Sequence, residues 1–235
     1  MTGAFLKAEW RHLVMLSYEV DPEVLAALLP HGTELDLWRG KTFVSMVGFR
    51  FLKTRVHGIP IPFHRDFDEV NLRFYVKHDH PEGVRRGVVF VKEIVPRAAI
   101  AWVARRVYNE NYVALPMRHR VAPPEVVYEW HHRGEWARMA VRLEGEAKLP
   151  HEDSEEAFIT EHYWGYAAQR DGSAMEYRVE HPKWNVWGVS ECELSGDLEP
   201  LYGVALSSFL TGRPSSAFVA DGSPIAVREG RKLER

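Results

Sequence analysis

Apolar and polar residues alternate without a break over residues 69–76, and this is the clearest pattern in the chain. Because successive side chains of a strand point to opposite faces, the stretch predicts a strand with one apolar and one polar face. The apolar face holds Val70, Leu72, Phe74 and Val76, and the polar face holds Glu69, Asn71, Arg73 and Tyr75. These polar side chains are of the kinds that orient a ligand. They converge on a cavity if this face lines the inside of a barrel, and they form only a solvated edge if it faces bulk water.

Further strands are predicted along most of the chain. They span residues 8–20, 41–56, 88–95, 126–130, 136–143, 177–179, 184–194 and 203–208. Many strands with few helices predict a mainly β (β-rich α+β) fold, a closed or nearly closed antiparallel barrel that encloses a cavity and has two or three peripheral helices. The length suits one large domain, so we expect a single domain over residues 1–235.

Three helices are predicted between these strands. A short one starts after Asp21, a good N-cap residue that is followed by Pro22. Residues 96–108 have the best helical spacing of apolar residues, and residues 154–168 follow a capping Ser154. We expect the proline-rich residues 58–62 to form a loop, and the charged tail from residue 228 to be frayed.

Composition excludes several classes of function. The chain is 46% hydrophobic and 12% aromatic with 8 Trp, which suits strands and pocket walls. The net charge of -3 gives no basic footprint, so we expect no nucleic-acid partner. The single cysteine, Cys192, fits a reducing compartment. The sequence has neither an apolar signal core at its start nor a run of membrane-spanning length, so we expect a soluble, cytoplasmic protein without a membrane partner.

No short motif names a reaction. The sequence contains no Gly-x-Ser-x-Gly, no Gly-x-Gly-x-x-Gly and no P-loop. His78 and His80 would lie on one side of an extended segment, as zinc ligands can, but Pro81 and Gly83 follow and favour a polar turn. We therefore expect neither a metal nor another cofactor. The sequence leaves the oligomeric state open, a homo-oligomer included.

Several short stretches together resemble a known family. They are Trp10-Arg11-His12-Leu13, Ser17-Tyr18-Glu19-Val20-Asp21-Pro22, Leu29-Pro30-His31-Gly32, residues 69–76, Glu161-His162-Tyr163 and His181-Pro182-Lys183-Trp184. In order and spacing they resemble the YqjF-like proteins, an uncharacterised family of the acetoacetate decarboxylase-like superfamily, from about residue 10 to residue 227. The resemblance implies a mainly antiparallel β-barrel or cone around a cavity.

The resemblance does not carry the decarboxylase chemistry. That chemistry uses a lysine in a Pro-Lys-Lys stretch after a helix, which forms a Schiff base with the substrate. Residues 109–117, the corresponding stretch here, contain no lysine. Glu69 falls where the decarboxylase has a glutamate on a strand, Arg11 lies near its N-terminal arginine, and Tyr112 stands roughly at the place of the missing lysine. The resemblance thus implies pocket positions rather than a mechanism.

Three hypotheses for function remain open. In the first, a cavity binds a small organic acid or apolar metabolite and acts on it. Arg73 holds its carboxylate or carbonyl, Glu69 serves as acid, base or dipole, and Tyr75 and Tyr112 donate hydrogen bonds. Glu69 and Arg73 lie about 13 Å apart along the strand, so they cannot pair with each other, and each needs a partner from elsewhere. In the second hypothesis the cavity belongs to a carrier or sensor without chemistry. In the third the barrel is filled by its own side chains and the protein is a structural or assembly module.

Overall fold

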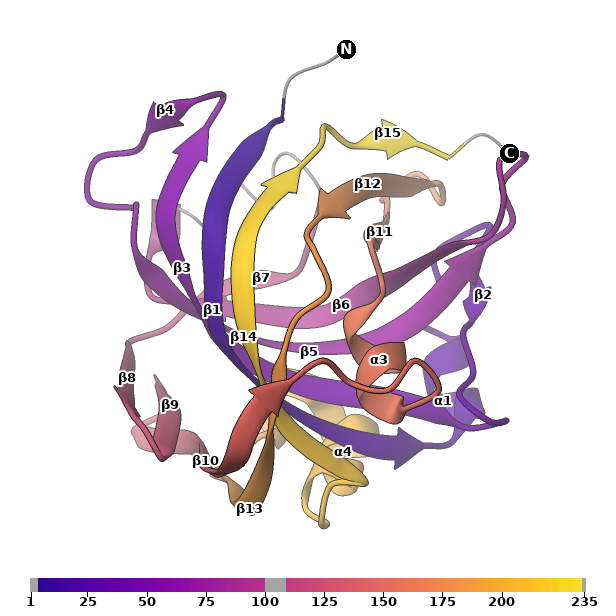
Figure 1. The fold of residues 1–235 in the computed structure, drawn as a ribbon. Helices are drawn as coiled ribbons and strands as arrows, with labels where there is room; N and C mark the ends of the chain where they lie inside the picture. Colours follow the sequence, from indigo (N-terminus) through magenta and orange to yellow (C-terminus); the bar gives the residue numbers. More distant parts are fainter. Residues whose placement is uncertain (1–3, 100–108, 234–235) are drawn as a thin grey trace.

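The computed structural model describes residues 4–99 and 109–233, which form one continuous twisted sheet with three short helices (Figure 1). The strands are β1 (Leu6–Val20), β2 (Glu34–Leu35), β3 (Thr42–Val56), β4 (Ile59–Pro60), β5 (Phe67–His78), β6 (Arg85–Val95), β7 (Tyr112–Ala114), β8 (Met117–Ala122), β9 (Glu125–His132), β10 (Glu135–Lys148), β11 (Trp164–Ala168), β12 (Ala174–Glu180), β13 (Val186–Ser195), β14 (Ser216–Val227) and β15 (Arg231–Lys232). The described helices are α1 (Pro22–Ala26), α3 (Glu155–Thr160) and α4 (Glu199–Leu210).

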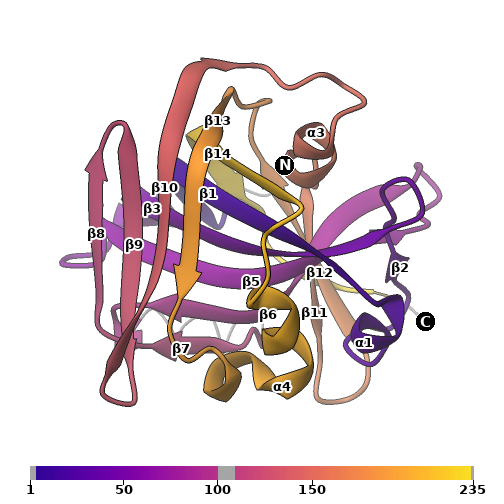
Figure 2. The same cartoon turned by 90° about the horizontal axis from the view of Figure 1, so that it is seen from below.

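The sheet closes into a ring. Its strand order β12-β11-β6-β5-β3-β1-β14 returns to β12 because Val179 on β12 pairs with Val227 on β14. Within this ring only β11 and β6 pair in parallel. From β14 the sheet continues through β13, β10, β9 and β8, which fold over the outside of the ring, with α4 beside them (Figure 2). The predicted mainly β fold with a closed sheet and peripheral helices is confirmed.

The strands of the ring are buried on both faces. On β5 the apolar face packs outward, in one core with Tyr128 of β9, Met139 of β10 and Leu206 of α4. The polar face points into the ring and is also buried, since Glu69 is 2% and Arg73 8% exposed. The second hydrophobic core lies on this inner side and is rich in aromatic residues. The predicted polar face is therefore not a solvated edge.

The helices agree with the sequence at their starts more than at their ends. Asp21 accepts a hydrogen bond from the Glu23 N–H (2.9 Å), and Ser154 accepts one from the Ala157 N–H (3.2 Å), as N-caps do. The helix predicted over residues 154–168 is too long, because α3 ends at Thr160 and the chain then forms β11. Most of the helix predicted over residues 96–108 lies outside the described residues.

The strand predicted over residues 203–208 is wrong, because these residues belong to helix α4. Tyr202, Leu206 and Leu210 recur every four residues and are all buried, which is helical spacing. The helix is interrupted at Gly203, where φ is 78°. A glycine inside the segment made its helical spacing of apolar residues hard to recognise in the sequence.

The last residues are ordered, and three strands were not predicted besides the short β2, β4 and β15 and the strand β11 that was predicted as helix. Arg231–Lys232 pair with β12 and Leu233 is buried, so the frayed tail is wrong for residues 228–233. The proline-rich segment is a loop apart from β4, which pairs at the edge of β3 where a proline is tolerated. Strands β7, β8 and β14 were missed. Within residues 4–99 and 109–233, no helix is long and apolar enough to cross a membrane.

Candidate functional site

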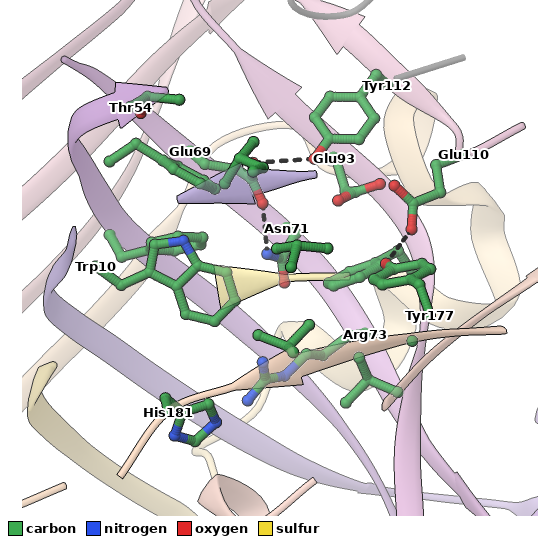
Figure 3. A pocket seen from close by; sticks show the side chains of 18 of the residues that line it. Trp10, Thr54, Glu69, Asn71, Arg73, Glu93, Glu110, Tyr112, Tyr177 and His181 are labelled. Carbon is green, nitrogen blue, oxygen red and sulfur yellow. Dashed lines mark hydrogen bonds between the residues drawn. The ribbon is translucent and has the colours of Figure 1, made fainter. Parts of the chain in front are cut away.

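The inside of the ring holds a pocket of about 310 Å³ (Figure 3). Every strand of the ring contributes a residue to its wall. Most of the wall is apolar and aromatic, including Trp10, Phe49, Phe51, Phe90, Trp164 and Trp184. The polar side chains gather on one side and include Glu69, Asn71, Arg73, Glu93, Glu110 and Tyr112. Such a cavity, largely apolar with a few converging polar groups, is typical of small-molecule sites.

Arg73 is a buried cation without a carboxylate partner. In the described part of the chain no Asp or Glu oxygen lies within 4.0 Å of its guanidinium. Its Nε is buried without a hydrogen-bond partner, and its Nη2 makes long contacts of 3.5 Å with the Ile159 carbonyl and 3.9 Å with Met15 Sδ. The ring of Tyr75 lies 5.7 Å from the guanidinium carbon. A guanidinium is costly to bury unpaired, and its planar fork fits a carboxylate.

A β-bulge helps to position this arginine. Along β5 and β6, Leu72 pairs with Lys92 whereas Arg73 pairs with Phe90, so Val91 is an extra residue on β6. Such bulges bend a strand and redirect the side chains next to them. In Figure 3 the guanidinium of Arg73 points toward His181 and away from the carboxyl groups of Glu93 and Glu110.

Three carboxyl groups, Glu69, Glu93 and Glu110, face the same pocket, and we call them the acid cluster. Glu69 accepts hydrogen bonds from Asn71 Nδ2 (3.0 Å) and from the Tyr112 hydroxyl (3.2 Å). Glu110 accepts one from the Tyr177 hydroxyl. Glu93 Oε2 is buried with no hydrogen-bond partner, in a residue that is 1% exposed. The cluster is therefore only partly satisfied by the protein.

Burial makes the acid cluster hold its protons. It raises the pKa of Glu69 to about 8, against the opposing hydrogen bond from Asn71. Burial raises the pKa of Glu110 to about 7, and that of Glu93 well above its usual range, with the neighbouring acids adding to the effect on Glu93. Glu69 and Glu110 thus titrate near neutral pH, where ordinary glutamates are already ionised.

The position of Tyr177 depends on a glycine. A Cβ built on Gly165 of β11 would lie 2.2 Å from the Tyr177 ring, which lies across the facing β12. Any larger residue at 165 would displace this ring and the hydrogen bond that it gives to Glu110.

A histidine from the end of α3 also lines the pocket. His162 Nε2 lies 3.0 Å from Asp36 Oδ2, which also accepts from Arg86 Nε at 2.6 Å. Burial lowers the pKa of His162 to about 4, although Asp36 opposes the shift. Burial acts to raise the pKa of Asp36, but the hydrogen bonds from His162 and Arg86 outweigh it and leave that pKa lowered. Asp36 is therefore ionised and accepts the Nε2–H of a neutral imidazole, so the lone pair is on Nδ1, which has no hydrogen-bond partner.

A second histidine is held neutral at the other side of Arg73. The ring of His181 stacks on Trp184, with centroids 4.0 Å apart and planes 16° from parallel. Burial lowers the pKa of His181 to about 4, and the nearby charge of Arg73 adds to the effect. Neither His162 nor His181 thus adds positive charge to the pocket near neutral pH.

Four of the predicted site residues line the pocket together: Glu69, Asn71, Arg73 and Tyr112. Two are placed elsewhere. The Tyr75 hydroxyl lies 2.6 Å from Ser45 Oγ, in the core beside the pocket. Arg11 pairs with Glu9 (2.9 Å) and donates to the Gly222 carbonyl (3.2 Å). Neither is among the described residues of the wall.

The sequence reasoning missed other pocket residues. Glu93 carried a usable signal, because it is an acid inside an otherwise apolar strand over residues 88–95. Glu110 carried none, since it precedes β7 in a polar stretch. Among residues 4–99 and 109–233, no group of three His, Cys, Asp or Glu side chains is placed to hold a metal ion.

Solved structures with the same fold are acetoacetate decarboxylase-like enzymes. The acetoacetate decarboxylase of Legionella pneumophila subsp. pneumophila str. Philadelphia 1 superimposes with a TM-score of 0.71 over 99% of this chain and 88% of that chain, at 13% identity. The enduracididine biosynthesis enzyme MppR complexed with pyruvate gives 0.68 over 100% and 92%, at 13% identity. An acetoacetate decarboxylase-like enzyme from Sphingomonas wittichii RW1 gives 0.66 over 99% and 94%, also at 13% identity. At such identities the likeness defines the fold alone.

The family follows from the sequence. The DUF2071 family model, "Uncharacterized conserved protein", matches residues 7–224, so the chain belongs to this family. A stretch of 80 residues is 34% identical to the uncharacterized protein YqjF of Bacillus subtilis (strain 168), and it spans 34% of this chain and 33% of YqjF, about a third of that relative. The predicted YqjF-like family and acetoacetate decarboxylase-like fold are confirmed.

The pocket lacks the amine that a Schiff base requires. None of its described wall residues is a lysine, and residues 100–108 contain no lysine in the sequence. Tyr112 of β7 stands in the stretch where the resemblance placed the missing lysine, and it donates to Glu69 instead.

Proposed function

We propose that this protein binds a small organic acid in the pocket, with the carboxylate on Arg73 and the hydrocarbon part against the aromatic wall, and without Schiff-base chemistry. The observation that carries the proposal is the buried guanidinium of Arg73, which has no carboxylate partner in the described part of the chain and whose Nε has no hydrogen-bond partner. A bound carboxylate supplies both the missing charge and the missing acceptor. The structural neighbour MppR was solved with pyruvate, a small carboxylic acid, which supports this class of ligand.

A volume of about 310 Å³ suits a small metabolite rather than a peptide or nucleic acid. The aromatic wall favours acids with a hydrocarbon chain or ring, since burying apolar surface stabilises by about 25 cal/mol per Å². The space inside the ring also argues against a structural module filled by its own side chains.

Turnover is a second candidate, favoured by Glu69. A carboxyl group with a pKa of about 8 holds a proton at neutral pH and can give it to a bound substrate or, once ionised, take one back. Tyr112 and Asn71 hold this carboxyl group in one orientation. A carrier needs only Arg73 and the wall, whereas a catalyst also needs Glu69.

The test is calorimetry and thermal shift with a panel of alkanoates, 2-oxo acids and arylacetates, each beside its neutral amide. A ligand at a hundred times its dissociation constant stabilises the native state by about 2.7 kcal/mol, so the shift is easily seen. Acids should bind more tightly than their amides, and Arg73→Met should weaken acid binding by about 2–3 kcal/mol. Arg118→Met is the matched control, because Arg118 pairs with Glu129 on the surface.

Two results would decide against the proposal. One is the absence of a shift with any acid, and the other is equal binding by wild type and Arg73→Met. Loss of turnover with retained binding in Glu69→Gln would identify a catalyst, and unchanged disappearance of substrate in this variant would remove Glu69 from any mechanism.

A further inference from the structure

We propose that the organic acid bound at Arg73 also carries a cationic nitrogen at its other end, and that the acid cluster receives this nitrogen. The ligand class is then an ω-amino acid or a related bifunctional acid. The inference rests on the proposed function, because it places the second end of the same ligand.

The acid cluster differs from the other buried carboxyl groups in lacking a cation among the described residues. Asp68 lies 2.8 Å from His119 and 3.7 Å from Arg50, and Glu176 lies 2.6 Å from Arg85. By contrast, no Lys, Arg or His nitrogen of residues 4–99 and 109–233 lies within 4.0 Å of a carboxyl oxygen of Glu69, Glu93 or Glu110. Buried acids are ordinarily paired, so three together without a cation indicate a group that arrives from outside.

Unpartnered acceptors accompany the missing charge. Glu93 Oε2 and Asn71 Oδ1 are both buried without a hydrogen-bond partner, and both residues line the pocket. They pair directly across β5 and β6, so these two acceptors share one part of the wall. A buried acceptor without a donor costs about 1–3 kcal/mol, and an ammonium group brings three donors.

The two ends of the site are separated along the sheet. Glu93 pairs with Asn71, two residues before Arg73, which places the Cα atoms of Glu93 and Arg73 about 8 Å apart by strand geometry. Figure 3 shows the Arg73 guanidinium directed toward His181 and away from Glu93 and Glu110. A carboxylate at Arg73 and a nitrogen at the acid cluster therefore belong to opposite ends of a ligand, as in an ω-amino acid, and not to one α-carbon.

Binding of such a ligand must release a proton. In the empty pocket burial raises the pKa of Glu69 to about 8 and that of Glu93 well above its usual range, so these two carboxyl groups favour the protonated form. An ammonium group stabilises the ionised form, so one carboxyl group passes its proton to solvent as the ion pair forms.

The experiment compares matched ligands by calorimetry at pH 7: hexanoate, 6-aminohexanoate and hexylamine, with the four- and eight-carbon homologues. Titrations in phosphate and in Tris, which differ in ionisation enthalpy, count the protons released. We expect at least one aminoalkanoate to bind 10-fold or more tightly than the alkanoate of equal length, with release of about one proton. Glu93→Gln should remove both effects.

Glu129→Gln is the control, since Glu129 pairs with Arg118 outside the pocket. It should preserve the preference for the aminoalkanoate. Equal or weaker binding of every aminoalkanoate, with alkanoates still dependent on Arg73, would overturn this inference and leave the proposed function standing. Failure of all acids to bind would overturn the proposed function itself. A preference that survives both Glu93→Gln and Glu110→Gln would also overturn the inference.

Discussion

Two neighbouring residues of β12 contact buried carboxyl groups with very different surroundings. Glu176 points out of the ring, where its Oε1 accepts from Arg85 (2.6 Å) and Arg231 (2.5 Å), and Arg85 also lies over Trp164. Tyr177 points into the ring and donates to Glu110 of the acid cluster, which has no such cations among the described residues. Glu176 and Glu93 are each only 1% exposed.

The comparison separates framework from site. Glu176 joins β6, β12 and β15 through ion pairs of its Oε1 with Arg85 and Arg231, so its charge is neutralised within the protein, although its Oε2 has no hydrogen-bond partner. The acid cluster retains protons and unpartnered acceptors, so its protonation state depends on a bound ligand or on pH. Equal burial thus serves stability in one place and recognition in the other.

The largest effect on stability should come from substitution of Glu176. Glu176→Gln removes the buried carboxylate partner of Arg85 and leaves it only the exposed Glu82, and removal of one partner of a buried ion pair costs about 3–5 kcal/mol. Urea denaturation should show this loss, and it should be nearly constant between pH 6 and 9. A loss below about 1 kcal/mol would mean that the network is not a framework.

Arg73→Met should lower ligand affinity and leave stability nearly unchanged. It removes an unpaired buried cation, so the free energy of unfolding should stay within about 1 kcal/mol of wild type. Affinity for carboxylates should fall by about 2–3 kcal/mol, the strength of hydrogen bonds to a charged group. Chemical denaturation and calorimetry on the same preparation measure both. A strongly destabilised Arg73→Met would show that Arg73, like Glu176, stabilises the fold.

The acid cluster should make stability depend on pH. The pKa of Glu69 is raised from about 4.5 when unfolded to about 8 when folded, so its contribution is fully present below pH 4.5 and is lost as pH rises to 8. Glu69→Gln should therefore exceed wild type in stability by about 2 kcal/mol at pH 9, with little difference at pH 5. Denaturation at the two pH values gives the comparison, and a gap that widens toward pH 5 would contradict it.

The smallest effect concerns Tyr75. Its hydroxyl continues a chain from Ser17 to Ser45, with oxygens 2.7 and 2.6 Å apart. Tyr75→Phe should cost about 1 kcal/mol of stability. If Tyr75 only supports the pocket, ligand affinity should remain unchanged. A large change in affinity in Tyr75→Phe would show that Tyr75 belongs to the ligand site.

Tyr112→Phe, which removes a donor to Glu69, should raise the pKa of that carboxyl group and shift the pH profile of binding.

The sequence predicted the part of the site that one strand controls. A period of two placed Glu69, Asn71 and Arg73 on one face, and that face is buried because the closed ring encloses it. Glu110 and His162 reach the pocket from segments far away in the chain, so only the pairing of strands brings them there. No local pattern encodes such a meeting.

Strand β14 was missed for a different reason. Asp221-Gly222-Ser223-Pro224 has the composition of a turn, yet it lies within β14 and pairs with β1. A Cβ on Gly222 would lie 2.1 Å from the Trp10 carbonyl oxygen, and φ at Gly222 is 77°. The glycine therefore permits two strands to cross closely where local propensity favours a reversal. The expected single domain over residues 1–235 stays a prediction.

Closure of the ring by β14 bears on how the protein is made. Strand β1 lies next to β14, so the pocket wall is completed by residues from near both ends of the chain. At synthesis rates of about 5–20 residues per second, about 10–40 s separate the emergence of these two strands from the ribosome. During that time β1 has an open edge, and Trp10 and the phenylalanines of β3 lack their cover. The nascent chain should therefore depend on chaperones more than its final stability suggests, and ligand can assist folding only after residue 227 has been made.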